Sequence, residues 1–153
     1  MIKKLFLIWA FLFLANCGYQ SVYLKNDNTL IKINKIKFEG DEKINRKILS
    51  LTGIKESSDL SNRYLLILNS KKNKDIASKN SAGNATSYKI SLDINISIID
   101  PINNEKIIKS KVFNSSFTYN NNQNKFELSQ NEKSILNNLI ESASKKIVMY
   151  LSL

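Results

Sequence analysis

Residues 87–98 read Ser-Tyr-Lys-Ile-Ser-Leu-Asp-Ile-Asn-Ile-Ser-Ile, and polar and apolar side chains alternate strictly along them. This period of two is typical of a β-strand with one apolar and one polar face, whereas the apolar positions of an amphipathic helix recur every three or four residues. A strand with one apolar face buries that face against a second layer. The chain is therefore predicted to contain a sheet with one covered side and one open side, and the open side carries Lys89, Asp93 and Asn95.

Two strands are predicted before this one. Residues 31–38 alternate but change parity midway, which predicts a strand with an irregularity that ends at Glu39-Gly40. Residues 64–68 are apolar at every position, as in a central strand or a strand that is covered on both faces. The polar run that follows, residues 69–75, is either an extension of this strand or a mobile loop.

A further strand is predicted to return beside residues 87–98. Residues 100–105 read Asp-Pro-Ile-Asn-Asn-Glu, which is typical of a turn, and the proline ends the strand before it. The return strand runs from about Lys106 to Tyr119, and its apolar residues change parity. This change predicts a bulge near residues 111–113.

Two amphipathic helices complete the pattern. Asp41 is a good N-cap and Gly53 a C-terminal stop signal for a short helix. Ser129-x-x-Glu132 has the form of a capping box, which predicts that a long C-terminal helix begins there. The apolar stripe of this helix is predicted to pack on the sheet and consists of Leu136, Leu139, Ile140, Ala143, Ile147, Tyr150 and Leu151. The order strand, helix, three strands, helix predicts an α+β two-layer sandwich, in which two helices cover one face of an about four-stranded, mostly antiparallel sheet.

The N-terminus has the pattern of a secretory signal. Lys3 and Lys4 precede an unbroken apolar run, residues 5–15, which has the length of the hydrophobic region of a signal peptide. The run is shorter than the ~20 residues of a membrane-spanning helix. It also lacks the polar face that a buried N-terminal helix, the alternative, would normally have. The predicted organisation is a signal peptide at residues 1–16, a lipidated N-terminus and tether at 17–30, and a single α+β domain at 31–153.

The residues at the end of this run resemble the lipobox of bacterial lipoproteins. Leu14-Ala15-Asn16-Cys17 has the aliphatic residue, the small residue and the invariant cysteine, while Asn16 departs from the usual Gly, Ala or Ser. The resemblance implies a diacylglycerol on the Cys17 thiol and an acyl chain such as palmitate on its amine, which together hold a protein firmly in a membrane. Gly18 rather than Asp follows the cysteine, so the inner-membrane retention signal is absent and the outer membrane is the expected location.

The composition argues against catalysis. The chain has no histidine, and Cys17 is its only cysteine, so the common general bases, nucleophiles and zinc ligands are missing once that cysteine is lipidated. The carboxylates of Asp93 and Asp100 belong to residues seven apart along one strand, which places them on opposite faces and more than ~20 Å from each other. We therefore expect no enzymatic activity, no metal site and no cofactor beyond the acyl groups.

The charge of the chain is strongly basic. Removal of residues 1–16, which carry two lysines and no acid, lowers the formal charge from +10 to +8. Such an excess attracts anionic glycolipids, membrane surfaces or nucleic acid, but a base composition that favours Ile, Asn, Lys and Ser codons also produces it. Since an exported, lipid-anchored chain rarely meets nucleic acid, no nucleic-acid partner is expected.

Several of these features resemble, in this order, the LPS-assembly lipoprotein family, LptE. They are Cys-Gly-Tyr directly after the lipobox, a strand and a short helix, the meander around residues 87–94, Phe117-Thr118-Tyr119-Asn120, and a closing helix that ends in Leu. The resemblance implies a lipoprotein that is anchored at the periplasmic side of the outer membrane. Such a protein plugs the LptD β-barrel translocon, assists its assembly and helps deliver lipopolysaccharide to the outer leaflet.

The resemblance also implies contact with lipopolysaccharide itself through basic residues. Candidates for contact with lipid A phosphates are Lys71, Lys72, Lys74 and Lys79, around the connection between the second and third strands, and Lys106 and Lys109, beyond the turn. Lysine binds phosphate as a point charge with little geometric demand, so the alternative for each is an ordinary solvated surface lysine. The alternative function is that of an accessory or structural outer-membrane lipoprotein of another envelope complex.

Overall fold

The computed structural model describes residues 33–58, 64–103 and 106–152. The predicted signal peptide and tether, including Cys17, lie outside these residues. The described elements follow the predicted order and are β1 (Ile33–Gly40), α2 (Glu42–Thr52), β2 (Tyr64–Lys79), β3 (Ala85–Asp100), β4 (Lys106–Asn120) and α3 (Lys125–Ser152).

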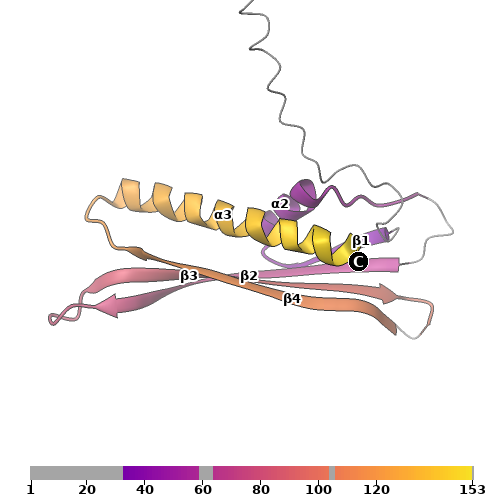
Figure 1. Ribbon diagram of the computed structural model, residues 1–153, viewed down its shortest axis with the longest axis horizontal. Coiled ribbons are helices and arrows are strands. Elements are labelled where there is room, and N and C mark those ends of the chain that lie inside the picture. Colours follow the sequence, from indigo (N-terminus) through magenta and orange to yellow (C-terminus); the bar gives the residue numbers. More distant parts are fainter. Residues whose placement is uncertain (1–32, 59–63, 104–105, 153) are drawn as a thin grey trace, which may run out of the picture.

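The four strands form one sheet in the order β1-β2-β3-β4. β1 and β2 are parallel, while β2 and β4 both run antiparallel to β3. Both helices lie on the same face of this sheet, and none of the described elements covers the other face (Figure 1). The predicted α+β two-layer sandwich is confirmed.

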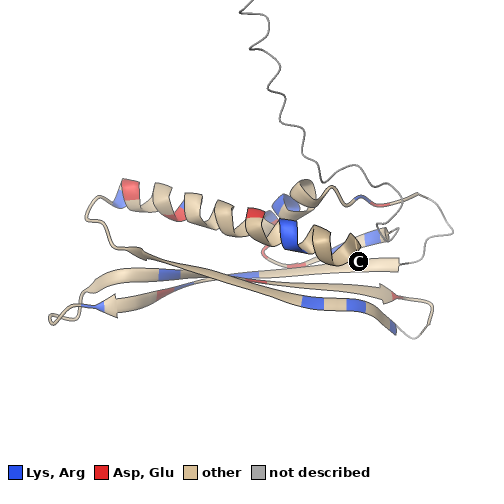
Figure 2. Ribbon diagram, viewed as in Figure 1, with Lys and Arg blue, Asp and Glu red and all other residues tan. Residues whose placement is uncertain are grey.

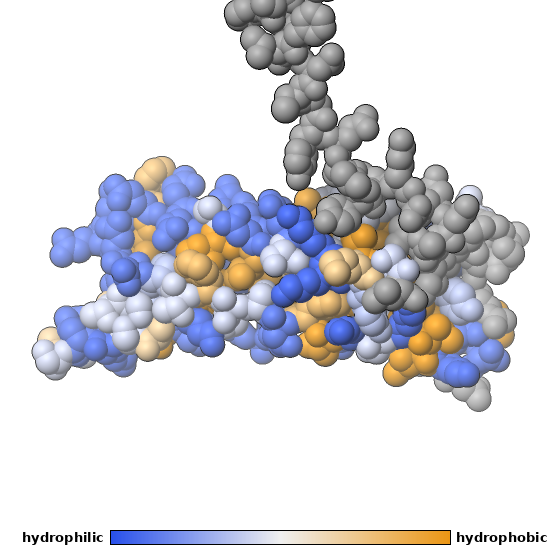
Figure 3. Space-filling view, viewed as in Figure 1, coloured by the Kyte–Doolittle hydropathy of each residue, from blue (hydrophilic) through white to orange (hydrophobic). Residues whose placement is uncertain are grey.

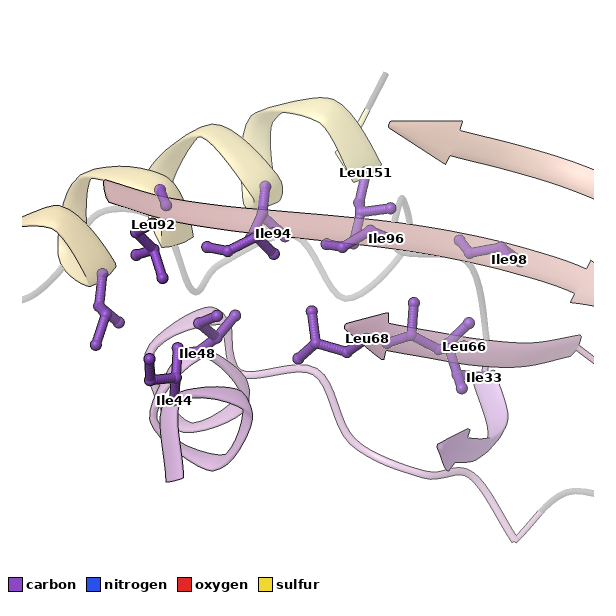
Figure 4. Packing of buried hydrophobic residues seen from close by; sticks show 13 residues of the cluster. Ile33, Ile44, Ile48, Leu66, Leu68, Leu92, Ile94, Ile96, Ile98 and Leu151 are labelled. Atoms are coloured by element: carbon purple, nitrogen blue, oxygen red, sulfur yellow. The ribbon is translucent and has the colours of Figure 1, made fainter. Parts of the chain in front are cut away.

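The core fills the space between the sheet and the two helices. Alternate residues of β3, from Leu92 to Ile98, are at most 1% exposed and point towards the helices. They meet Leu66 and Leu68 of β2 and Ile48 of α2, as Figure 4 shows. Each such aliphatic side chain contributes about 1.5–3 kcal/mol by its burial. The predicted stripe of α3 is confirmed, since all of its members are either buried in this core or packed against it.

β2 is much longer than its apolar segment. It continues through the polar run after Leu68 as far as Lys79, so the extension rather than the loop is correct. β3 pairs with it from Leu65 opposite Ile99 to Lys79 opposite Ala85. The backbone of β3 therefore supplies hydrogen-bonding partners along nearly all of β2, with register shifts between Ile76 and Lys79, whatever side chains β2 carries.

The pairing of the strands shows the irregularity predicted in β1. In β4 the irregularity lies at a different position from the predicted one. The irregularity in β1 is confirmed between Ile33 and Lys35. The bulge predicted near residues 111–113 is wrong, because the pairing of β4 with β3 is continuous there. The shift lies nearer the start of β4, where Ile98 pairs with Lys109 but Ile99 pairs with Ile107. The apolar parity changes near Val112 because that side chain is 54% exposed, on the uncovered side of the sheet.

The two helices differ in how well local sequence predicted their ends. Asp41 caps α2, since its Oδ1 accepts a hydrogen bond from the Ile44 N–H at 3.1 Å. Gly53 ends α2 in the left-handed conformation, with φ 69°. The capping box predicted at Ser129 is wrong, because α3 begins one turn earlier and Asn124 Oδ1 accepts from the Phe126 and Glu127 N–H groups at 3.1 and 3.3 Å. Glu132 is consequently a mid-helix residue that is free to reach the sheet.

β1 and β2 approach closely where β1 ends. Gly40 has φ 71°, and a Cβ atom built on it would lie 2.1 Å from the carbonyl oxygen of Ser70. The same oxygen accepts a hydrogen bond from the Asp41 N–H at 2.9 Å. Only glycine fits this position, since any side chain would displace the backbone of β2.

Candidate functional site: the open face of the sheet

The uncovered side of the sheet, named the open face here, is a polar surface. Alternation along each strand brings to it the residues that lie between the buried ones. Its polar members from β2, β3 and β4 are Asn69, Lys71, Asn73, Asp75, Lys89, Ser91, Asp93, Asn95, Ser97, Ser110, Asn114, Ser116 and Thr118. The predicted positions of Lys89, Asp93 and Asn95 are confirmed by this register.

The charges of the open face are balanced across strands. Lys71 of β2 lies opposite Asp93 of β3, and Asp75 of β2 lies opposite Lys89 of β3. Opposite charges at paired positions of an antiparallel sheet attract each other weakly. Asp93 Oδ1 also accepts a hydrogen bond from Asn114 Nδ2 of β4 at 2.6 Å. The central part of this face therefore offers hydrogen-bonding groups rather than a net charge.

A shallow depression of about 310 Å³ lies on this face between β3 and β4. Its lining residues are Lys89, Ser91, Asp93, Asn114, Ser115 and Ser116. None of them is apolar, and ligand pockets are usually lined predominantly by apolar side chains. The depression therefore suits a hydrogen-bonding protein surface better than a small-molecule ligand.

The carboxylates considered as an acid–base pair lie far apart. Asp93 and Asp100 lie seven residues apart in β3, which corresponds to about 23 Å along the strand. No three metal-ligating side chains come together among residues 33–58, 64–103 and 106–152. Within the same residues, no helix has both the length and the apolar composition needed to cross a bilayer.

The six candidate lysines do not form one site. Lys71 lies on the open face, whereas Lys72 and Lys74 alternate with it and lie on the helix side. Only Lys79 adjoins the connection between β2 and β3, and it pairs with Ala85. Lys106 and Lys109 lie at the other end of the sheet, where Lys106 pairs with Asp100. The distance along β3 from Ala85 to Asp100 is about 50 Å.

Lys74 is held by an intramolecular network. Its Nζ lies 2.5 Å from Glu132 Oε1 of α3 and 4.5 Å from the centroid of the Tyr88 ring. The Tyr119 hydroxyl donates to the same carboxylate oxygen at 2.7 Å. These four residues, named the Glu132 cluster, join α3 to β2, β3 and β4. The pairing of Lys74 with Glu132 leaves its ammonium less available for an external phosphate.

The pKa values in the Glu132 cluster reflect this arrangement. Burial alone would raise the pKa of Glu132, but hydrogen bonds from Lys74 and Tyr119 and the charges of Lys74 and Lys72 lower it below its ordinary value. Burial raises the pKa of Tyr119, and its hydrogen bond to the Glu132 carboxylate raises it further. Glu132 is thus an anion and Tyr119 a neutral donor at physiological pH.

One surface that the sequence did not predict lies at the end of the sheet where β4 begins. Ile102, Ile107 and Ile108 are 70%, 61% and 40% exposed, respectively. Ile102 falls in the predicted turn, residues 100–105, and the other two fall in the predicted return strand, without an expectation that any of the three is exposed. The signal that could have found them is the doublet Ile107-Ile108, because two adjacent apolar residues cannot both face the core from a regular strand.

The fold is shared with solved bacterial lipoproteins. The structure of rare lipoprotein B from Shewanella oneidensis matches with a TM-score of 0.57 and 14% identity, over 78% of this chain and 94% of that one. A minor lipoprotein from Acinetobacter baumannii matches with a TM-score of 0.56 and 15% identity, over 80% of this chain and 92% of that one.

A third solved structure, an uncharacterized lipoprotein B from Nitrosomonas europaea, matches with a TM-score of 0.52 and 9% identity, over 81% of this chain and 86% of that one. Comparisons with protein-family models and with curated proteins find no match. At such low identities the structural likeness shows the shared fold.

Proposed function

We propose that this chain is an outer-membrane lipoprotein that plugs the LptD β-barrel translocon, assists its assembly and helps deliver lipopolysaccharide to the outer leaflet. The observation that carries the proposal is the combination of a lipobox cysteine, Cys17, with a domain that shares the fold of solved bacterial lipoproteins. In this proposal the acyl groups on Cys17 hold the domain at the periplasmic side of the membrane.

The open face is the surface that meets the barrel in this proposal. The lumen of a transmembrane β-barrel is lined by polar side chains and contains water. A face of serine, asparagine and threonine can exchange hydrogen bonds with such a lining. Its charges are paired, Lys71 with Asp93 and Asp75 with Lys89, so they present little net charge to the barrel. The apolar face, by contrast, is already occupied by α2 and α3.

The role of the chain in this proposal is that of a binding protein, with no reaction of its own. Contact with lipid A phosphates is assigned to the exposed candidate lysines that are not paired with Glu132, namely Lys71, Lys72, Lys79 and Lys106. Lys74 is the weakest candidate because Glu132 neutralises it. Since the six lysines occupy both ends and both faces, each would contact a glycolipid separately as it passes.

Co-purification tests this proposal, with charge-matched variants on two surfaces. The tagged, full-length chain is expressed with the barrel, solubilised in detergent and captured. Asp93→Lys places a cation directly opposite Lys71, and we expect it to reduce the recovered barrel severalfold. Glu141→Lys makes the same change in charge on the exposed surface of α3 and should leave recovery unchanged.

Two results would overturn the proposal. Absence of the barrel beside a stably expressed, acylated chain would favour an accessory role in another envelope complex. Equal recovery with both variants, whose folding is checked by thermal unfolding, would remove the open face from the interface. Cys17→Ala, which should abolish acyl labelling and retention in the membrane, tests the anchor independently of the barrel.

A further inference from the structure

The end of the sheet where β4 begins carries exposed apolar side chains that the proposed function does not use. Ile102, Ile107 and Ile108, named the apolar end, are all well exposed. Figure 3 shows the corresponding hydrophobic patch over the start of β4. The register shift creates it, because Ile98 pairs with Lys109 and Ile99 with Ile107, so Ile108 is an extra residue between them.

Lysines and a tyrosine border the apolar end. β4 contains three lysines, Lys106, Lys109 and Lys111, and no acidic residue. Figure 2 shows these basic positions gathered in the first half of the strand. The Nζ atoms of Lys109 and Lys111 lie 5.6 and 5.4 Å from the ring centroid of Tyr150, whose hydroxyl donates to the Ser110 carbonyl at 3.1 Å. Apolar side chains flanked by lysine and tyrosine are typical of surfaces that enter the headgroup region of a bilayer.

The course of the chain places this end close to Ile33, the first described residue after Cys17. Ile33, where β1 begins, pairs with Tyr64, and the next residue of β2 pairs with Ile99, which in turn pairs with Ile107. Adjacent strands lie about 4.8 Å apart, so Ile33 is about 15 Å from the start of β4. Figure 1 shows β1 and the start of β4 at the same end of the molecule.

The length of the connection to Cys17 distinguishes the two ends of the sheet. The sixteen steps from Cys17 to Ile33 span at most about 55 Å. The hairpin between β2 and β3 lies about 45–50 Å from Ile33, so placing that hairpin on the bilayer would require an almost fully extended connection. Placing the apolar end on the bilayer requires no such extension.

We propose that the apolar end inserts into the anionic phospholipid surface that holds the acyl groups of Cys17, so that the membrane holds the domain at two points. The three isoleucines enter the boundary between headgroups and acyl chains. Lys106, Lys109 and Lys111 reach the phosphates around them. This inference rests on the lipid anchor of the proposed function and not on the barrel.

Tryptophan fluorescence can test the insertion without background. Trp9 is the only tryptophan of the sequence and lies in the predicted signal peptide, so the processed chain has none. The reporter is Ile102→Trp in the processed, acylated protein, bound to vesicles of neutral and anionic phospholipid that carry brominated acyl chains. We expect blue-shifted emission and strong quenching. The wild-type protein is the blank.

The domain offers a matched control at its opposite end, where α3 begins (Figure 1). Phe126 at the start of α3 is 71% exposed, compared with 70% for Ile102. Phe126→Trp, bound to the same vesicles, should emit as a solvated tryptophan and remain unquenched. Equal quenching of both reporters, or quenching of Phe126→Trp alone, would overturn the proposal. Blue-shifted emission of Ile102→Trp that disappears on dilution without vesicles would also overturn it, by assigning the surface to a second copy of the chain.

The lysines provide a second measurement. In the Ile102→Trp background, Lys106→Gln combined with Lys111→Gln should weaken the preference for anionic vesicles by about fivefold for each lysine. Lys125→Gln combined with Lys133→Gln, both exposed at the start of α3, should leave it unchanged. If the variant with Lys106→Gln and Lys111→Gln kept the wild-type preference for anionic vesicles, the proposed contact of these lysines with phosphates would be contradicted.

Acyl labelling of Cys17 is recorded on the same preparations to separate this inference from the proposed function. A labelled protein whose Ile102→Trp reporter remains unquenched overturns the insertion alone. An unlabelled preparation overturns the anchor, and with it this inference. Recovery of the LptD barrel bears on neither result.

Discussion

The two faces of β3 are made of alternate residues of one strand, yet they have different roles. On the helix side, Leu92 and Ile94 are fully buried in the core. On the open face, Asp93 and Asn95 lie one residue further along and remain accessible. The difference teaches that burial is decided here by the direction of a side chain and not by position along the chain. Changes on the first face should therefore destabilise the domain, and changes on the second should leave its stability nearly unchanged.

The largest effect is expected from Ile94→Ala. Removal of a fully buried aliphatic side chain leaves a cavity and should lower the free energy of unfolding by about 2–5 kcal/mol. Its neighbour provides the control, because Asn95→Ala on the open face should change that free energy by less than about 0.5 kcal/mol. Urea unfolding, followed by circular dichroism, measures both. Similar losses for the two variants would contradict the division between the faces.

Gly40→Ala should have the next largest effect. The added Cβ would lie 2.1 Å from the Ser70 carbonyl oxygen, and the backbone has φ 71°. Steric overlap and strain together should destabilise the domain by about 2–4 kcal/mol. Gly83→Ala separates these causes, since Gly83 has φ 82° but nothing within 4 Å of its added Cβ. Strain alone, about 1 kcal/mol, is expected there. The melting temperatures of the two variants would show the difference.

Glu132→Gln should have a smaller effect that depends on pH. The substitution removes the carboxylate that accepts from Lys74 and Tyr119, at a cost of about 1–2 kcal/mol at neutral pH. Because the pKa of Glu132 is lowered by folding, its contribution is present above the ordinary Glu range and is lost as pH falls through the folded-state value. The variant and the wild type should therefore approach equal stability at acid pH, below the lowered folded-state pKa of Glu132.

Glu141→Gln is the matched control for this pH dependence, since Glu141 lies exposed on the same helix. Urea unfolding across the acid range should show a constant, small difference from the wild type for Glu141→Gln. A similar pH profile for both variants would exclude a specific role for the Glu132 cluster.

The smallest effect is expected between Lys71 and Asp93. These residues face each other across β2 and β3 on an accessible surface, where opposite charges attract by about 0.5 kcal/mol or less. A double-mutant cycle with Lys71→Ala and Asp93→Ala, measured by unfolding at low and high salt, gives this coupling. A coupling of several kcal/mol would show that the open face also stabilises the fold.

Local signals predicted the elements whose ends depend on nearby residues. The alternation of residues 87–98 predicted β3 and its two faces. Asp41 and Gly53 correctly predicted the ends of α2 because both act on backbone groups within one turn. The C-terminal helix was predicted with its stripe, but its start was not, because Asn124 as well as Ser129 can cap a helix and the sequence does not rank them.

Features that depend on a partner strand could not be predicted in this way. The polar half of β2 has no periodic pattern, and it is a strand because β3 runs beside it. The parity change in β4 was detected but attributed to the wrong place, since an exposed Val112 and a register shift give the same pattern in sequence. The lysines near residue 74 were grouped by their proximity in the chain, whereas an extended strand sends neighbours to opposite faces.

The amino-acid sequence by itself determined the α+β fold class, the order of elements and the polar character of the open face. These follow from composition and from short-range periodicity, which a single chain carries locally. The tertiary structure alone decided the length of β2, the place of the register shift, the pairing of Lys74 with Glu132, and the position of the apolar end beside the start of β1. The reason is physical, because each of these depends on contacts between segments that are far apart in the chain, and the free energy of such contacts is realised only when the sheet has formed.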